Sequence, residues 1–475
     1  MIFSSLQFLF LFLPIVLLGY YIIPTRFLNI WLLISSIVFY YLSARNYVWL
    51  LLVIISIAHI SGYVLARIYD KFTRKLILVL SLIVMLTFMC YYKYSDFVMK
   101  NINMILHRDQ VLVHTVLPIG ISFFVFQAVS YVVDSYRYGT TSKNFFDTAL
   151  YISFFPQLIA GPIVRYSDIQ SCLEVERREK NFDRLSSGMW RFFIGLCKKV
   201  IIADTLGSLV DIVFGVTDIH GYSVLYAWLG AIAFALQIYY DFSGYSDMAI
   251  GLGHVFGFEI KENFNYPYAA RSIKDFWERW YISLSNFFKE YVYIPLGGNR
   301  CKKSRWIFNM MVVWFLTGLW HGASWTFMIW GLLYGVILVI ERFYINRKIH
   351  TLQFVKISNR IGHVYTLFLV CILWVIFRSQ DIWQATAFIS VLIGKTQKGF
   401  YGTDFLFLLQ NYAFVLIIAV IFSMSIIPKI KQKIENDKLL TLFQYGSSIA
   451  IFIGVVVSFS MIYMNSYSPF LYFMF

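Results

Sequence analysis

The chain has 475 residues, of which 59% are hydrophobic and only 14% are charged. A soluble globular protein carries about 45–50% apolar and about 25% charged residues, so this composition excludes the soluble, disordered and fibrous classes and indicates a polytopic membrane protein. The net charge of +15 does not indicate nucleic-acid binding, because the basic residues lie in short loops between apolar segments, where they orient a membrane protein.

Apolar segments that can cross a bilayer recur along the whole chain. Crossing the hydrocarbon core of roughly 30 Å takes about 20 apolar residues in a helix. Such segments lie at 8–23, 28–42, 47–66, 76–92, 111–133, 222–240, 306–320, 325–340, 364–377, 405–427 and 447–463, with less regular ones at 145–164 and 192–214. The sequence therefore predicts an all-α protein with about eleven or more transmembrane helices, plus re-entrant and interfacial helices, in a single membrane-embedded domain, residues 1–475.

Basic clusters set the predicted topology. The strongest lie at 67–75, 300–305, 342–356 and 429–433, and the positive-inside rule places them in the cytoplasm. Counting spans from these loops leaves the N-terminus and the uncharged tail, 465–475, on the outer side. The first apolar run has no positive charge before it and no small-residue cleavage pattern behind it, which predicts a retained span in the inner or plasma membrane.

Two apolar stretches differ from plain spans. Residues 154–162 contain two prolines and a glycine, which fits either a Pro-kinked helix or a re-entrant segment that walls a cavity. Ser272 and Asp275 have the spacing of a helix start, and aromatic and leucine side chains then recur at helical spacing up to Tyr291. This pattern predicts an amphipathic helix lying in the membrane interface.

A polar cluster lies at the end of the apolar segment at 222–240. Residues 239–247 read YYDFSGYSD, with two carboxylates and several hydroxyls around a glycine. These side chains are candidates to line a polar pocket, and a polar helix end at the interface is the alternative. The candidate pocket-lining residues are Tyr239, Tyr240, Asp241, Ser243 and Tyr245.

His321 is the most informative position for chemistry. It lies where two apolar segments meet between two basic loops, which predicts a hairpin with His321 near its turn. An ionisable side chain at membrane depth is costly and is a functional candidate by default, and histidine takes and gives protons near neutral pH. Gly318 and Gly322 would allow a helix or a ligand to approach closely. A hydrogen-bonded packing histidine among tryptophans is the alternative.

Patterns typical of metal sites and of soluble enzymes are missing from the sequence. The five cysteines show no paired spacing and fit small core residues rather than a disulfide framework. No H-E-x-x-H, P-loop, G-x-S-x-G or clustered Cys/His pattern occurs. We therefore expect no bound metal and no bound cofactor.

Several long motifs, in order, resemble the membrane-bound O-acyltransferases, specifically the bacterial branch of alginate O-acetyltransferases and related cell-envelope polysaccharide acetylation proteins. They are FFPQLIAGPIVRYSD at 154–168, QIYYDFSGYSDMAIGLG at 237–253, ENFNYP at 262–267, the stretch 271–300, the block LTGLWHGASW at 316–325 and SPFLYF at 468–473. The resemblance implies a ring of transmembrane helices around a thinned centre, with a tunnel that joins a cytoplasmic donor to an external acceptor.

The resemblance also implies an activity. His321, in the Trp-His-Gly block, would be the catalytic residue, and acetyl-CoA on the cytoplasmic side would be the acyl-donor substrate. An extracytoplasmic SGNH-type acetyltransferase, or polysaccharide export machinery, would be the partner through which the acetyl group reaches the hydroxyls of a glycan acceptor. D-alanyl transfer to teichoic acid, a non-catalytic scaffold and a transporter of the same fold are the alternatives.

One residue departs from the family pattern. The family usually carries WHISLS in the predicted interfacial helix, whereas this chain reads WYISLS at 280–285. A tyrosine, with a pKa of about 10, is no base near pH 7 but can donate a hydrogen bond to a carbonyl. We therefore expect His321 as the general base, with Tyr281, Trp280 or the 239–247 cluster as donors to the developing oxyanion.

The remaining expected site residues lie around these positions in the sequence. Trp320 and Trp325 are expected beside the catalytic histidine. The basic loop offers candidates for binding the phosphates of CoA, with topology-setting charges as the alternative. These candidates are Arg300, Lys302, Lys303 and Arg305.

Overall fold

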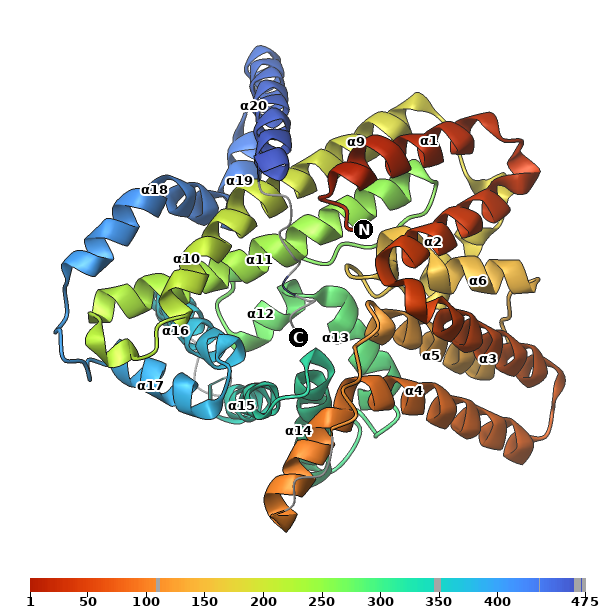
Figure 1. Cartoon of the computed structure of the whole chain (residues 1–475), viewed down its shortest axis with the longest axis horizontal. Helices are drawn as coiled ribbons and strands as arrows, with labels where there is room; N and C mark the ends of the chain where they lie inside the picture. The colour runs from red at the N-terminus through yellow and green to blue at the C-terminus, as the bar shows by residue number, and fades with distance from the viewer. Residues whose placement is uncertain (108–111, 346–351, 435, 465–470, 472–475) are drawn as a thin grey trace. The chain divides into compact units, whose positions relative to one another are not determined.

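The computed structural model describes residues 1–107, 112–345, 352–434, 436–464 and 471 (Figure 1). All regular secondary structure in these residues is helical, which confirms the all-α prediction. Contacts divide the chain into two compact units, Met1–Phe193 with Tyr245–Glu262 and Ile194–Gly244 with Asn263–Phe475. The helices α9 (Phe182–Cys197) and α11 (Val224–Val255) each contribute to both units. A single functional domain stays a prediction.

The first unit contains the N-terminal helices. Helix α3 packs against α4, α5 and α6. The contact with α5 is close because Gly62 carries no side chain, and a Cβ there would lie 2.6 Å from the ring of Tyr131. The helices of this unit are α1 (Leu13–Ile22), α2 (Leu28–Ala44), α3 (Val48–Arg67), α4 (Lys71–Leu106), α5 (Ile121–Tyr138), α6 (Phe145–Ser153), α7 (Phe155–Leu158) and α8 (Tyr166–Ile169).

The second unit contains the predicted hairpin, formed by α14 and α15 (Figure 1). A Cβ on Gly318 would lie 2.3 Å from the carbonyl oxygen of Phe327, and a Cβ on Gly331 would lie 2.3 Å from that of Trp314. The two backbones therefore touch directly, and the hairpin prediction is confirmed. The helices of this unit are α10 (Thr205–Phe214), α12 (Ile273–Arg279), α13 (Ile282–Phe288), α14 (Lys303–His321), α15 (Trp325–Ile340), α16 (Leu352–Arg378), α17 (Ile382–Leu392), α18 (Thr403–Ser423), α19 (Ile426–Lys433) and α20 (Asp437–Met464).

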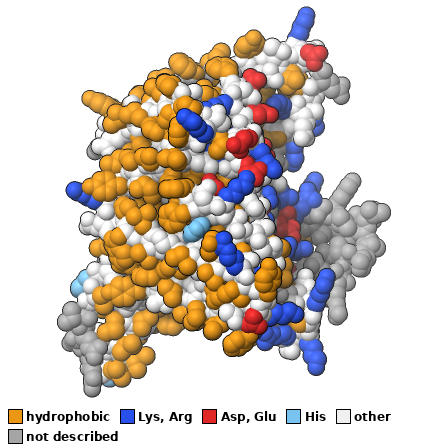
Figure 2. Space-filling model, turned by 90° about the vertical axis from the view of Figure 1, so that its right-hand side faces the viewer, with side chains coloured by type: hydrophobic (Ala, Val, Ile, Leu, Met, Phe, Trp, Pro, Cys, Tyr) orange, Lys and Arg blue, Asp and Glu red, His pale blue; other side chains and the backbone are white. Residues whose placement is uncertain are grey.

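Seven helical segments in the described residues are long and apolar enough to cross a membrane, which confirms a multi-span protein. The segment Thr25–Arg67, at 43 residues, combines α2 and α3 and supplies two crossings, since about 20 residues suffice for one. A shorter apolar helix, Phe8–Ile22, corresponds to the first expected segment, and a second one, Ile382–Leu392, was not among the expected segments. Hydrophobic side chains gather on the left of the face shown in Figure 2, whereas charged side chains gather toward the right. Side chains of α18 and α20 are exposed, with Phe414 75% and Phe452 69% exposed. Such faces suit contact with lipid.

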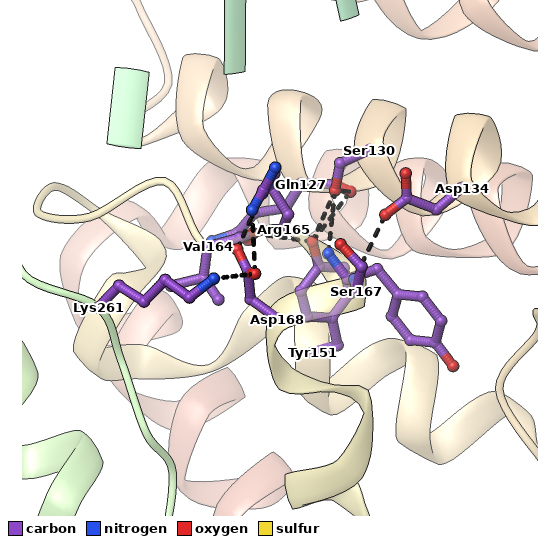
Figure 3. A network of polar contacts seen from close by, with 10 residues as sticks. Gln127, Ser130, Asp134, Tyr151, Val164, Arg165, Ser167, Asp168 and Lys261 are labelled. Carbon is purple, nitrogen blue, oxygen red and sulfur yellow. Dashed lines mark hydrogen bonds and ion pairs between the residues drawn. The ribbon is translucent and has the colours of Figure 1, made fainter. Parts of the chain in front are cut away.

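Irregular backbone follows α6 and is buried. The helix stops at Phe154, whose ψ is 111°, and only the four-residue α7 follows. Gln157 Nε2 donates a hydrogen bond to the Tyr151 carbonyl at 2.9 Å. Tyr151 Oη donates to the Val164 carbonyl at 2.9 Å (Figure 3). Broken backbone at membrane depth is tolerated where protein buries it in this way. The broken segment is thus confirmed over the kinked helix, and its role as a cavity wall stays a prediction.

A charged cluster closes the end of this segment (Figure 3). The guanidinium of Arg165 donates to both oxygens of Asp168, from Nε at 2.8 Å and from Nη2 at 3.0 Å. Lys261 Nζ lies 2.5 Å from the same carboxylate. On the other side of the segment, the backbone N–H of Ser167 donates to Asp134 Oδ2 at 3.3 Å. These contacts tie the chain after the break to α5 and to the segment that follows α11.

Asp168 should make the stability of the protein depend on pH. Burial alone raises the pKa of its carboxyl, but hydrogen bonds and positive charge from Arg165 and Lys261 outweigh burial and lower it overall. A pKa lower in the folded state gives stabilisation that is complete above about pH 4 and is lost as the pH falls through the folded value. We expect Asp168→Asn to cost about 1 kcal/mol at pH 7, and to make thermal unfolding in detergent less dependent on pH below about pH 4. Identical acid dependence in the two proteins would contradict this assignment.

Candidate functional site

His321 is the last residue of α14, at the turn into α15, and only 4% of it is exposed. Its imidazole lies against three aromatic rings that are nearly perpendicular to it: Trp320 at 5.0 Å, Trp330 at 5.1 Å and Phe377 at 5.2 Å between centroids. These rings fix the orientation of the imidazole and shield it from lipid. A histidine held in this way can exchange a proton only with a group brought directly to it.

Trp320 lies between His321 and the segment that departs from the family pattern. The ring of Tyr281 is 5.9 Å from that of Trp320, and Tyr281 is 1% exposed. The neighbouring Trp280 contacts Trp374 on α16 at 5.0 Å. One buried aromatic cluster thus contains four of the predicted site residues, His321, Trp320, Tyr281 and Trp280.

Trp325 is the most exposed of the predicted site residues around the histidine. It begins α15, four residues after His321, and is 53% exposed. The chain reverses direction between α14 and α15, so Trp325 lies on the other side of the turn. Its predicted role beside the histidine stays a prediction.

The predicted interfacial helix is not continuous. Its start is confirmed, because the Ser272 hydroxyl accepts a hydrogen bond from the Asp275 N–H at 3.0 Å. However, α12 ends at Arg279 and α13 begins at Ile282, with Tyr281 in the left-handed region at φ 45° and ψ 55°. The apolar stripe itself is buried on both helices. The helical spacing predicted the buried face correctly, but it gave no sign of the break.

The polar cluster at the end of the 222–240 segment contains a buried ion pair. Lys199 Nζ lies 2.8 Å from Asp241 Oδ1 and 2.5 Å from Asp204 Oδ1, with the side chains of Lys199 and Asp241 only 4% and 1% exposed. The backbone N–H of Leu471 donates to Asp241 Oδ2 at 2.9 Å. The rest of the C-terminal tail, 465–475, lies outside the described residues, and so does most of the SPFLYF motif. Asp241 is therefore held by ionic and backbone contacts rather than open to a ligand.

The other members of this predicted pocket are also buried. Tyr239 contacts Trp280 at 6.2 Å, and Tyr240 Oη donates to the carbonyl of Ala419 at 2.6 Å. Ser243 is 3% exposed. Tyr245 belongs to the first unit, where its ring stacks on Phe3 at 4.7 Å. Tyr239 connects this group to the aromatic cluster, and the ring of Tyr240 lies 5.0 Å from that of Tyr239.

The basic loop lies at the far end of α14 from His321. Eighteen residues separate Lys303 from His321 along this helix, which is about 27 Å at 1.5 Å per residue. The four basic residues are at least partly exposed, and Lys303 Nζ and the Arg305 guanidinium lie over the rings of Phe343 and Phe308. A contact with the phosphates of CoA and a role as topology-setting charges both stay predictions for these residues.

Comparison with known proteins decides the family. The sequence pattern of the membrane-bound O-acyltransferase family matches residues 58–379. The chain belongs to this family. It is 40% identical over 389 residues to a probable alginate O-acetylase of Azotobacter vinelandii, covering 80% of this chain and 76% of that protein. It is 35% identical over 427 residues to a peptidoglycan O-acetyltransferase of Helicobacter pylori, covering 83% and 80%.

A more distant relative performs a different transfer. The chain is 30% identical over 275 residues to a teichoic acid D-alanyltransferase of Bacillus subtilis, covering 55% of this chain and 69% of that protein. The protein is therefore an O-acyltransferase of the membrane, in agreement with the predicted enzyme class.

This membrane-bound O-acyltransferase has site features that sequence reasoning missed. Trp330, Phe377 and Trp374 surround the histidine and Trp280, but they come from α15 and α16, and no motif connects them to the Trp-His-Gly block. Trp330 is fully buried. Within the described residues no three His, Cys, Asp or Glu side chains are placed to hold a metal ion.

Proposed function

We propose that this membrane-bound O-acyltransferase moves an acetyl group from cytoplasmic acetyl-CoA toward hydroxyl groups of an extracytoplasmic polysaccharide. The observation that carries this proposal is the placement of His321. It is buried in an aromatic cluster that also contains Tyr281, at the position where the family usually has a second histidine. Similarity to the alginate and peptidoglycan O-acetylating relatives over most of the chain supports acetyl as the acyl group and a glycan as the acceptor.

In this mechanism His321 is the general base. It removes the proton of the acceptor hydroxyl as the oxygen attacks the thioester carbonyl, and the thiolate of CoA leaves as the ester forms. The proton then passes from the imidazolium to that thiolate. The Tyr281 hydroxyl and the indole N–H of Trp280 are the donors we assign to the developing oxyanion. The surrounding rings exclude water, which favours transfer to the acceptor over hydrolysis.

The direction of transfer rests on the basic loops. If the clusters at 67–75 and 300–305 are cytoplasmic, the N-terminus lies outside the cell. The donor then enters from the cytoplasmic side of the inner or plasma membrane. A hydroxyl acceptor on the other side would then be the side chain of an SGNH-type partner or the glycan itself. Similarity to the Bacillus subtilis relative keeps D-alanyl transfer to teichoic acid as the second candidate.

Acetyl-CoA turnover by the purified protein in proteoliposomes tests the proposal. We expect release of free CoA that depends on an added acceptor glycan, with or without an SGNH-type protein on the outer side. D-alanyl thioester of a carrier protein, supplied in parallel, distinguishes the second candidate. Turnover of neither thioester, even with partner and glycan present, would leave a scaffold or a transporter of the same fold.

Replacement of Tyr281 tests its role as a donor. We expect Tyr281→Phe to lower kcat at least tenfold, because loss of one oxyanion donor usually costs about 100-fold or more. Tyr281→His restores the family residue and should raise kcat, since histidine titrates near neutral pH and accepts positive φ more readily than a bulky tyrosine. The measurement is kcat for CoA release by the three proteins. Equal kcat in wild type and Tyr281→Phe would exclude a role for the hydroxyl.

A further inference from the structure

The backbone of Tyr281 is in a conformation that a tyrosine rarely adopts. Its φ of 45° lies in the left-handed region, which is unfavourable for a residue with a Cβ. Such a conformation persists only when the surrounding structure enforces it, and it is common at functional sites. Tyr281 is not a glycine, so its neighbours must supply the constraint.

The segment beginning at Asn263 supplies this constraint. The side-chain oxygen of Asn263 accepts two hydrogen bonds from Ser283, from the backbone N–H at 3.1 Å and from Oγ at 2.9 Å. The backbone carbonyl of Asn263 accepts from the N–H of Ile282 at 3.0 Å. On the other side of Tyr281, the N–H of Asn265 donates to the carbonyl of Arg279 at 2.9 Å. The chain is thus fixed on both sides of the strained residue.

The same segment also holds the ring of Tyr281. Phe264, between the two asparagines, lies nearly parallel to the Tyr281 ring at 6.2 Å and perpendicular to Trp280 at 5.2 Å. Asn263 itself is 1% exposed. The side-chain oxygen of this buried asparagine thus caps the first turn of α13 from a distant part of the chain.

We propose that Asn263 is a positioning residue, which holds Tyr281 in its left-handed conformation and so places the phenol ring against Trp320, on the face of the cluster that contains His321. This inference rests on the proposed function for its consequence in catalysis. It also gives a physical role to Asn263 in the ENFNYP motif, one of the motifs that resemble the family.

Paired asparagine variants test the proposal. Asn263→Ala removes both hydrogen bonds to Ser283 and should lower kcat about tenfold with little change in KM. Asn263→Asp keeps an acceptor oxygen at a helix start, where a negative charge is favourable, and should retain kcat within about twofold. The matched control is Asn309→Ala, which removes another fully buried asparagine of the same unit, whose Nδ2 donates to the carbonyl of Leu296 at 3.1 Å. It should lower stability and leave kcat per folded molecule unchanged.

A double-mutant cycle distinguishes positioning from simple stabilisation. If Asn263 acts through Tyr281, then Asn263→Ala should have no further effect on kcat in a Tyr281→Ala background. If Asn263 only stabilises the fold, the two effects on kcat will be independent, and the proposal is overturned. If kcat of Asn263→Asp is as low as that of Asn263→Ala, the proposal is also overturned.

Hydrogen exchange gives a readout that does not need activity. In Asn263→Ala the amide of Ser283 should exchange about tenfold faster than in wild type, because it loses its acceptor, whereas Asn309→Ala should leave this amide unchanged. An unchanged exchange rate in Asn263→Ala would overturn the constraint on Tyr281. Absence of thioester turnover in wild type would instead refute the proposed function, so the two failures are distinguishable.

Discussion

His321→Ala should abolish acyl transfer while leaving the protein folded. General-base catalysis is worth about 10²–10⁴ in rate, so we expect kcat for CoA release to fall by about three orders of magnitude. His321→Gln should fall similarly, because a carboxamide fills the same space between Trp320, Trp330 and Phe377 but cannot carry the proton. The measurement is single-turnover CoA release from acetyl-CoA in proteoliposomes.

A second histidine in a predicted span provides the matched control. His59 lies in α3, where its Nδ1 is 2.9 Å from Thr148 Oγ1. His59→Ala should change kcat by less than about twofold, because this residue belongs to the first unit and to no proposed step. A loss of rate in both variants would mean that removing any intramembrane histidine damages the fold. Full activity in His321→Ala would refute the assigned base.

Lys199→Met should be among the most destabilising single substitutions in the protein. Lys199 is the only cation that the described contacts place between Asp241 and Asp204. Its removal takes the ammonium group away from the carboxylates of Asp204 and Asp241, of which Asp241 is 1% exposed. Breaking a buried pair costs about 3–5 kcal/mol. Asp241→Asn should cost less, about 1–3 kcal/mol, because Lys199 keeps Asp204 and the amide oxygen still accepts from Leu471.

The order of these effects is the sharpest part of the test. In denaturant titration in detergent micelles, the free energy of unfolding should decrease from wild type to Asp241→Asn to Lys199→Met. The double variant that combines both substitutions should be more stable than Lys199→Met alone. Lys274→Met is the control, since the Lys274–Glu278 pair is 70% and 63% exposed and should contribute less than about 1 kcal/mol. If Lys199→Met were as stable as this control, the ion pair would not stabilise the fold.

The sequence predicted those parts of the fold that depend on local composition. Apolar length predicted the multi-span helical protein, and two apolar segments meeting at His321 predicted the hairpin of α14 and α15. The Ser272 helix start and the buried stripe that follows it were also predictable, because both depend on residues close together in the chain. The family motifs identified the histidine without any knowledge of its surroundings.

What sequence reasoning missed depends on contacts between distant residues. The break at Tyr281 is imposed by Asn263, about twenty residues earlier, and periodicity cannot report a constraint from outside the helix. Phe377 reaches the histidine from α16, more than fifty residues later.

The direct backbone contact between α14 and α15 limits how this enzyme can acquire a new acyl specificity. Any side chain added at Gly318 or Gly331 would force two helices apart and displace His321 with them. Phe377 contacts the imidazole from α16, so its size can change while the hairpin keeps its geometry. A mutant library aimed at longer acyl chains should therefore vary Phe377 and keep both glycines fixed.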